Sequence, residues 1–302
     1  MTDGAPAIAT FGLGKRYAGS NKFAVKELDL NIMPGEVYGF LGPNGAGKST
    51  TIRLLMNFIQ PTEGHALIKN LNVVSQSVQV KKTVGYLPGE MALYNKMKGR
   101  QFLAYMAQLQ PPKRAGYIRE LAKLFQVDLG MKIGQLSKGN RQKIGLIQAL
   151  MHEPDVLILD EPTGGLDPLM QEVFFELVRQ AKGGGATFFI SSHNLGEVQK
   201  MCDRVGFIRE GKLIAEHTIS ELATQTLQTY NISFGEDSPL HELRRISGAK
   251  VKVNTPRHVT LSLKGDLKPL FAVLARHKVN GLEHEEINLE EEFLRFYRGG
   301  KK

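Results

Sequence analysis

Cysteine and tryptophan are almost absent from this 302-residue sequence, which has one cysteine and no tryptophan. The single cysteine, Cys202, excludes an internal disulfide and indicates a reducing compartment, and we expect it to be a packed thiol near a helix end. Long apolar runs are also missing, and no stretch approaches the roughly 20 residues of a membrane-spanning helix. Residues 1–10 lack the basic and apolar blocks of a secretory signal. The sequence therefore predicts a chain without a spanning segment.

Acidic residues are fewer than basic residues, because the sequence has 30 Asp and Glu and 39 Lys and Arg, for a net charge of +9. An excess of this kind fits nucleic acid, an anionic membrane surface or phosphate ligands. The basic residues are scattered, with no long basic block and no interleaved aromatic array. We therefore expect a solvated basic surface and no nucleic-acid partner.

Strand-like and helical patterns alternate through most of the chain. Strand patterns occur at 23–41, 66–69, 156–159 and 188–191, and helical patterns occur at 48–58, 102–109, 118–125, 137–151 and 173–182. Pro111 and Pro112 separate the two helices in the middle. The predicted fold class is α/β, with a mixed, largely parallel core sheet and a helical subdomain at about 90–151.

The C-terminal part has a different pattern. After polar sequence around 219–228, the order is strand-helix-strand-strand-helix-strand-helix, with short strands first at 230–234 and last near Ile287, and a closing helix at 289–297. This order predicts a small α+β domain, and a ferredoxin-like sandwich is our preferred assignment. We therefore predict two domains, residues 1–222 and residues 223–302.

A glycine-rich segment between an apolar strand and a helix matches the phosphate-binding P-loop pattern in full. It consists of Gly42, Pro43, Asn44, Gly45, Ala46, Gly47, Lys48 and Ser49, followed by Thr50. Glycines let backbone N–H groups face phosphates, and the positive end of the following helix favours the same anions. Lys48 would reach the β- and γ-phosphates of ATP, and Ser49 would offer a hydroxyl to Mg²⁺. A chance glycine-rich turn is the alternative, and the number of fixed positions argues against it.

Two carboxylates follow the strand-like segment 156–159. Asp160 and Glu161 stand at the carboxyl end of that strand, where open α/β sheets bind ligands. Asp160 would hold Mg²⁺ through a water molecule, and Glu161 would orient or deprotonate the water that attacks ATP. An acidic pair that only begins a turn, as Pro162 permits, is the alternative. The P-loop in the same chain favours the catalytic interpretation.

Three more segments occur in a fixed order around these carboxylates. They are Leu-Ser-Lys-Gly-Asn at 136–140, Thr-Gly-Gly-Leu-Asp-Pro at 163–168 and Ser-Ser-His at 191–193. With them, the sequence from about Ile8 to Glu216 closely resembles the nucleotide-binding subunits of ATP-binding cassette transporters. The resemblance implies a P-loop ATPase that binds ATP and Mg²⁺ and couples hydrolysis to transport.

The resemblance also implies further site residues. Tyr17 resembles the aromatic residue that stacks on adenine, and Ser137 and Gly139 resemble the signature that caps the γ-phosphate of ATP on the opposite subunit. Asp167 resembles the aspartate that crosses the dimer interface, and His193 resembles the histidine that contacts the γ-phosphate. Considered alone, Tyr17 could be a surface aromatic, Ser137 a helix N-cap (a role that we expect as well) and His193 a cap of the next helix.

The sequence departs from the family pattern at three places. Lys138 and Asn140 replace a glycine and a glutamine of the signature, changes that resemble some export-type subunits. Gly89 stands where the family has a glutamine that touches Mg²⁺ and the attacking water, a contact that glycine cannot make. The adjacent Glu90 could replace that glutamine or could cap the next helix, and we favour the cap.

Two partners are implied by the resemblance. One is a second nucleotide-binding subunit, in a homodimer with ATP between its faces, and the other is an integral membrane permease, with this chain peripheral on its cytoplasmic face. The run 288–294 resembles the tail of drug and polysaccharide export ATPases and favours export. The alternatives are a soluble cassette ATPase acting on nucleic acid or the translation machinery, and a non-catalytic nucleotide sensor. A single cassette argues against members that act on the ribosome, and the absence of a long coiled-coil insertion argues against members that act on chromosomes. The presence of Glu161 and His193 argues against a sensor.

Overall fold

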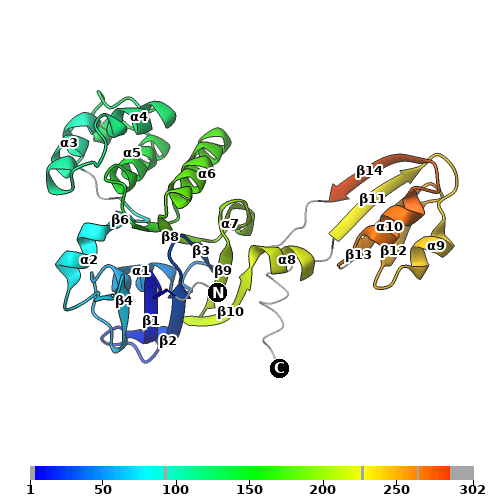
Figure 1. The fold of residues 1–302 in the computed structure, drawn as a ribbon, viewed down its shortest axis with the longest axis horizontal. Coiled ribbons are helices and arrows are strands. Elements are labelled where there is room, and N and C mark those ends of the chain that lie inside the picture. The colour runs from blue at the N-terminus through cyan, green and yellow to red at the C-terminus, as the bar shows by residue number, and fades with distance from the viewer. Residues whose placement is uncertain (1–3, 92–93, 226–227, 264, 286–302) are drawn as a thin grey trace. The chain divides into compact units, whose positions relative to one another are not determined.

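The computed structural model describes residues 4–91, 94–225, 228–263 and 265–285. The chain divides into two compact units, Met1–His217 and Thr218–Lys302, and each is considered by itself (Figure 1). The boundary predicted after residue 222 falls inside the helix α8 (Ile219–Gln225). No helix among the described residues is long and apolar enough to cross a membrane.

A six-stranded sheet forms the centre of the first unit. Its strand order is β10-β9-β3-β8-β7-β6. The strands are β3 (Val37–Leu41), β6 (Val84–Leu87), β7 (Val156–Asp160), β8 (Thr187–Ser192), β9 (Arg204–Arg209) and β10 (Lys212–Thr218). Strands β9, β3, β8, β7 and β6 pair in parallel. Every residue of β3, β7 and β8 is buried, as expected of parallel strands covered on both faces. The predicted α/β class with a largely parallel sheet is therefore confirmed.

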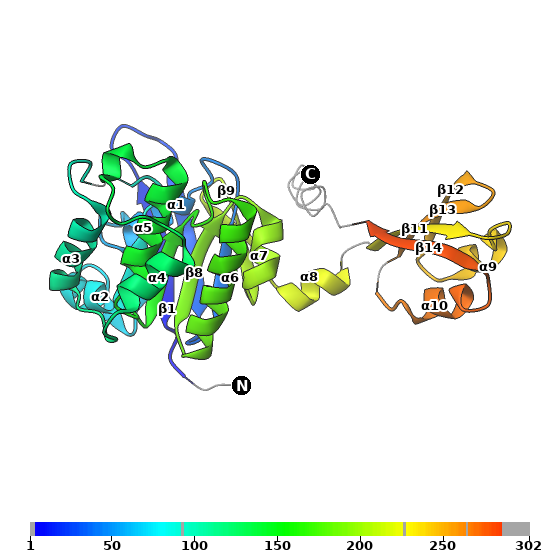
Figure 2. The same cartoon turned by 90° about the horizontal axis from the view of Figure 1, so that it is seen from above.

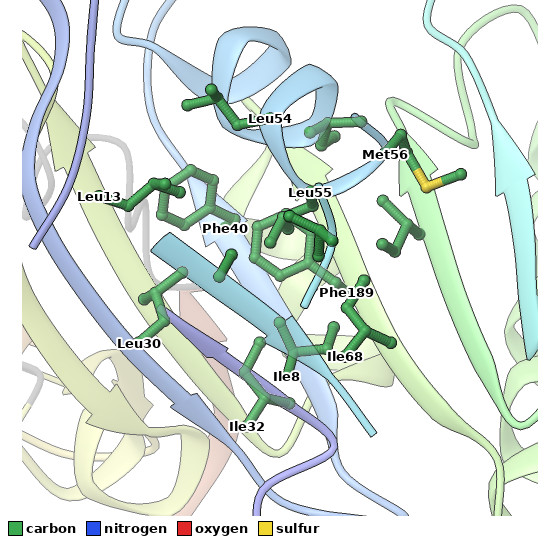
Figure 3. Close-up of a cluster of buried hydrophobic side chains, with 14 of the residues drawn as sticks. Ile8, Leu13, Leu30, Ile32, Phe40, Leu54, Leu55, Met56, Ile68 and Phe189 are labelled. Atoms are coloured by element: carbon green, nitrogen blue, oxygen red, sulfur yellow. The ribbon is translucent and has the colours of Figure 1, made fainter. Parts of the chain in front are cut away.

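A second, antiparallel sheet packs with the helix α1 (Lys48–Leu55) against the central sheet. Its order is β2-β1-β4-β5, formed by β1 (Ile8–Arg16), β2 (Phe23–Ile32), β4 (Glu63–Ile68) and β5 (Leu71–Asn72). Figure 3 shows the shared core, in which Ile8 and Leu30 lie close to Phe40, Leu55 and Phe189. Helix α1 ends before the predicted residue 58, because the backbone at Asn57 is left-handed, with a φ of +50°.

Some of the remaining helices of this unit lie against the central sheet, and others pack on a neighbouring helix (Figures 1 and 2). They are α2 (Ser77–Thr83), α3 (Gly99–Leu109), α4 (Tyr117–Leu124), α5 (Lys138–Leu150), α6 (Pro168–Gly183) and α7 (Leu195–Met201), with a short 3₁₀ turn at Ile133–Gln135. Helices α3, α4 and α5 form the predicted helical region, and Pro111 and Pro112 lie between α3 and α4. Cys202 is buried at the end of α7, and burial raises the pKa of its thiol, as expected of a packed, unreactive cysteine.

The second unit begins with α8, and its other described residues form a four-stranded antiparallel sheet and two further helices. Its elements are β11 (Gln228–Phe234), α9 (Leu240–Arg245), β12 (Lys250–Thr255), β13 (His258–Leu263), α10 (Lys268–Leu274) and β14 (Val279–Glu285). The sheet order is β12-β13-β11-β14, and the apolar side chains of the sheet and helices share one core. The order of the described elements is the predicted one, and the ferredoxin-like assignment stays a prediction. The predicted strand end at Ile287 and the closing helix at 289–297 lie outside the described residues.

Candidate nucleotide-binding and hydrolysis site

The glycine-rich segment connects β3 to α1, as predicted. Gly45 and Gly47 have φ values of +80° and +113°, in the region that glycine adopts without strain. A Cβ on Gly47 would also lie only 2.6 Å from the carbonyl oxygen of Ala24. The side chain of Lys48 is 6% exposed, and its Nζ donates to the carbonyl oxygens of Gly42 at 2.5 Å and Pro43 at 3.3 Å. The loop therefore surrounds a buried cation at the start of a helix.

The carboxylate of Asp160 lies at the carboxyl end of β7, beside this loop. It is 5% exposed, and its Oδ1 accepts a hydrogen bond from Ser191 Oγ. Its Oδ2 is so close to Gly89 that a Cβ at position 89 would lie 3.0 Å from it. The loop and the carboxylates share one cavity of about 220 Å³, lined by Ala24, Pro43, Asn44, Gly45, Gly47, Lys48, Ser49, Thr50, Gly89, Asp160 and Glu161.

Glu161 occupies the centre of the polar contacts in this cavity. Its Oε1 is 3.3 Å from Lys48 Nζ, and its Oε2 is 2.6 Å from His193 Nδ1. The backbone of Glu161 is left-handed, with a φ of +49°, which is unusual for a residue with a side chain. The first turn after β7 therefore directs this carboxylate between a lysine and a histidine.

His193 does not cap the helix that follows it. Asn194 is the N-cap of α7, and its side chain accepts a hydrogen bond from the backbone N–H of Glu197 at 3.3 Å. The ring of His193 is thereby left to contact Glu161. The alternative interpretation of His193 as a helix cap was wrong.

Ser137, Gly139 and Asp167 do not line the cavity. Ser137 is the N-cap of α5, and its Oγ accepts from the backbone N–H of Asn140 at 3.2 Å, so the expected capping role is present. Asp167 similarly caps α6 by accepting from the N–H of Met170 at 3.0 Å. Gly139 packs so tightly on the carbonyl oxygen of Gly165 that a Cβ would overlap it. These residues therefore lie on helix ends and loops outside the cavity of their own chain.

Tyr17 also lies outside that cavity. It follows β1 directly, its side chain is 40% exposed, and Lys15 Nζ lies 5.7 Å from the centre of its ring. An exposed ring at this position is available to stack on a planar ligand.

Glu90 does not cap the next helix, and it does not line the cavity. The next helix, α3, begins at Gly99 with Lys98 as its N-cap, so Glu90 is too far away to act as a cap. The side chain of Glu90 is exposed and makes no hydrogen bond or ion pair with any described residue. It does not line the cavity, although Gly89 does. The helix-cap interpretation was therefore wrong.

Two residues to which the sequence assigned no role make important contacts with Glu161. Gln142, on α5, is 5% exposed, and its Nε2 donates to the carbonyl oxygens of Glu161 at 3.2 Å and Pro162 at 2.9 Å. Ser191 accepts a hydrogen bond from the backbone N–H of Glu161 through its Oγ at 3.1 Å. Gln142 stands between Arg141 and Lys143 in a polar stretch of α5, so no contrast in the sequence marks it as buried.

A P-loop between a parallel strand and a helix, with an aspartate and a glutamate at the end of a neighbouring strand, defines a nucleotide-hydrolysing P-loop protein. Comparisons with known proteins give the family. Residues 25–164 match the family described as ABC transporter. The uncharacterized ABC transporter ATP-binding protein YhaQ of Bacillus subtilis is 33% identical, over 90% of this chain and 92% of that protein.

Two further similarities agree. The linearmycin resistance ATP-binding protein LnrL of Bacillus subtilis is 31% identical, over 92% of this chain and 95% of that protein. A solved ATP-binding subunit of an ABC transporter is 26% identical with a TM-score of 0.65, over 72% of this chain and 91% of that one. The chain belongs to the ABC transporter family and is one of its ATP-binding, ATP-hydrolysing proteins.

Proposed function

We propose that this chain dimerises around ATP and drives export through a separate integral membrane permease, resting on the cytoplasmic face of the membrane. The first domain would be the motor and the second an accessory domain. The main support is the cavity in which Lys48, Asp160 and Glu161 meet, with His193 bound to the same glutamate. A lysine that could bind phosphate thus lies beside a carboxylate that could bind the attacking water.

The roles at one site follow from these contacts. Backbone N–H groups of 42–50 would bind the phosphates of ATP, and Lys48 would add a charge-assisted contact. Ser49 and Asp160 would hold Mg²⁺, because a hydroxyl and a buried carboxylate lining one cavity are the hard oxygen ligands that this ion prefers. Mg²⁺ would neutralise phosphate charge during hydrolysis.

Glu161 would accept a proton from the water whose oxygen attacks the γ-phosphorus, while the bond to the β-phosphate oxygen breaks. His193 would hold Glu161 in place through the 2.6 Å contact with Oε2. Lys48 Nζ lies 3.3 Å from Oε1 of Glu161, so its positive charge would offset part of the repulsion between this carboxylate and the phosphates.

The second subunit would complete the site. We infer that Ser137 and Gly139, at the N-terminus of α5, cap the γ-phosphate of ATP bound to the partner, that Asp167 crosses the interface, and that Tyr17 stacks on adenine. The first turn of α5 has backbone N–H groups that favour anions. The location of Ser137 and Gly139 outside the cavity of their own chain is consistent with action on a partner's ATP.

Export is favoured because a relative that matches along nearly its whole length is named for linearmycin resistance. The test is isolation of the tagged chain from cells together with the membrane protein encoded in the neighbouring reading frame. We expect an integral membrane protein to co-isolate and Lys48→Ala to abolish transport without releasing the chain from it. Isolation with RNA and without a membrane protein would contradict the proposal.

A further inference from the structure

The peptide groups of Glu161 are held on both sides by side chains from other elements. The N–H of Glu161 donates to Ser191 Oγ at 3.1 Å and to the carbonyl oxygen of Ser191 at 3.2 Å, both on β8. The carbonyl oxygen of Glu161 accepts from Gln142 Nε2, on α5, at 3.2 Å. The side-chain Nε2 of Gln142 also donates to the carbonyl oxygen of Pro162 at 2.9 Å. Gln142 therefore binds two consecutive carbonyl groups of the turn that directs Glu161 into the cavity.

This turn needs external support, because the conformation of Glu161 is unfavourable. A φ of +49° brings the Cβ of a non-glycine residue close to its own backbone, and such residues persist only where surrounding contacts hold them. Gln142 is almost completely buried, so its two hydrogen bonds form away from competing water. Loss of these bonds would allow the peptide to rotate, and the carboxylate would move with it.

We propose that Gln142 is a positioning residue for Glu161, and that it thereby ties the signature helix to the hydrolysis site of the same chain. The proposal rests on the functions proposed above for Glu161 and Ser137. Gln142 does not line the cavity, and it acts through the backbone carbonyl groups of Glu161 and Pro162.

Helix α5 contacts the segment after β7 at a second point. Gly139, in the first turn of α5, packs directly on the carbonyl oxygen of Gly165, four residues beyond Glu161. The start of α5 and the segment 161–165 therefore contact each other at both ends. A shift of α5 when Ser137 meets the partner's ATP would be transmitted through Gln142 to Glu161. Each chain would thus adjust its own glutamate according to the nucleotide held by its partner.

The first test is turnover of Gln142→Met, which keeps the length of the side chain and removes both donors. Gln110→Met is the matched control, because Gln110 Nε2 also donates to a backbone carbonyl, that of Lys81 at 2.7 Å, but Gln110 is the C-cap of α3. We expect kcat to fall about tenfold or more in Gln142→Met with little change in KM for ATP, since a misplaced catalytic group lowers kcat. A kcat equal to that of the control would overturn the proposal.

The second test separates positioning of Glu161 from support of the signature. In a covalently linked dimer, the first half carries Ser137→Arg and the second half carries Lys48→Ala. One competent site remains, with the P-loop and Glu161 of the first half and the signature of the second. The proposal predicts that Gln142→Met lowers kcat when it is placed in the first half and has little effect in the second.

An effect confined to the second half, or equal effects in both halves, would overturn the proposal, because Gln142 would then support the signature or the helix in general. If the linked dimer is inactive before Gln142 is changed, the shared-site function has failed. In that case, turnover of Gln142→Met in the unmodified dimer still decides whether Gln142 positions Glu161.

Discussion

Replacing Glu161 by glutamine removes the proton acceptor and keeps the shape of the side chain. In the structure, the two carboxylate oxygens have different partners, Lys48 Nζ at 3.3 Å and His193 Nδ1 at 2.6 Å. Glutamine retains one of these oxygens and replaces the other by an amide nitrogen, so the fold should be little disturbed. Loss of a general base typically lowers turnover by about 10²- to 10⁴-fold. At 1.36 kcal/mol for each tenfold change, this corresponds to about 2.7–5.4 kcal/mol in the activation barrier.

ATP binding should survive this change, because Lys48 and the loop amides stay in place. The variant should therefore accumulate as an ATP-bound dimer. The assay is release of phosphate at saturating Mg-ATP, with gel filtration in the presence of ATP to detect the dimer. Glu176→Gln is a suitable control, since Glu176 is exposed on α6 and pairs only with Arg179 and Gln180 among the described residues. Turnover of Glu161→Gln within a few-fold of the unmodified chain would show that another group accepts the proton.

Three other predictions concern binding, the departure at Gly89 and stability. Lys48→Ala should raise the Kd for ATP by about tenfold or more, because hydrogen bonds to charged groups contribute about 1.5–3 kcal/mol. Binding of a fluorescent ATP analogue would measure this change. Equal affinities would contradict the phosphate-binding role of Lys48. Gly89→Gln should hydrolyse ATP faster than Gly89→Ala, because both variants place a Cβ 3.0 Å from Asp160 Oδ2 but only glutamine supplies an amide. Glu90→Ala should leave turnover unchanged. A large loss of turnover in Glu90→Ala would refute this expectation. Burial lowers the pKa of His152, so the unfolded chain binds the proton more readily than the folded chain. The free energy of unfolding should therefore fall as the pH drops below about 6.5. The midpoint of urea unfolding should fall less with pH in His152→Leu, and an equal fall would show that His152 is not the cause.

The phosphate-binding part of the site could be predicted because its chemistry is local in sequence. The P-loop folds between one strand and one helix, and its glycines, Lys48 and Ser49 are determined by short-range geometry. The buried strands β3, β7 and β8 were predictable for a similar reason, since continuous apolar runs indicate parallel strands. The carboxylates at the end of β7 then follow from the position of that strand.

The contacts that hold Glu161 could not be predicted in this way, because they join distant elements. Gln142 approaches from α5 and Ser191 from β8, and neither distance in space follows from the spacing in sequence. The function expected of Glu90 failed for a related reason. Its proximity to a predicted helix suggested a cap, but the helix begins at Gly99, and an intervening segment separates the two. The short elements α2, β6, β9 and β10 also gave no clear periodic signal, since few residues define each of them.

If ATP is hydrolysed at a site shared by two chains, two inactive variants with different defects should restore activity when they are mixed. Lys48→Ala removes the phosphate contact but leaves the signature intact, and Ser137→Arg blocks the signature but leaves the P-loop intact. A mixed dimer has one site with an intact P-loop and an intact signature. We predict that each variant alone is inactive and that the mixture, or a covalently linked pair, recovers hydrolysis. Persistent inactivity of both the mixture and the linked pair would contradict a site shared by two copies of this chain.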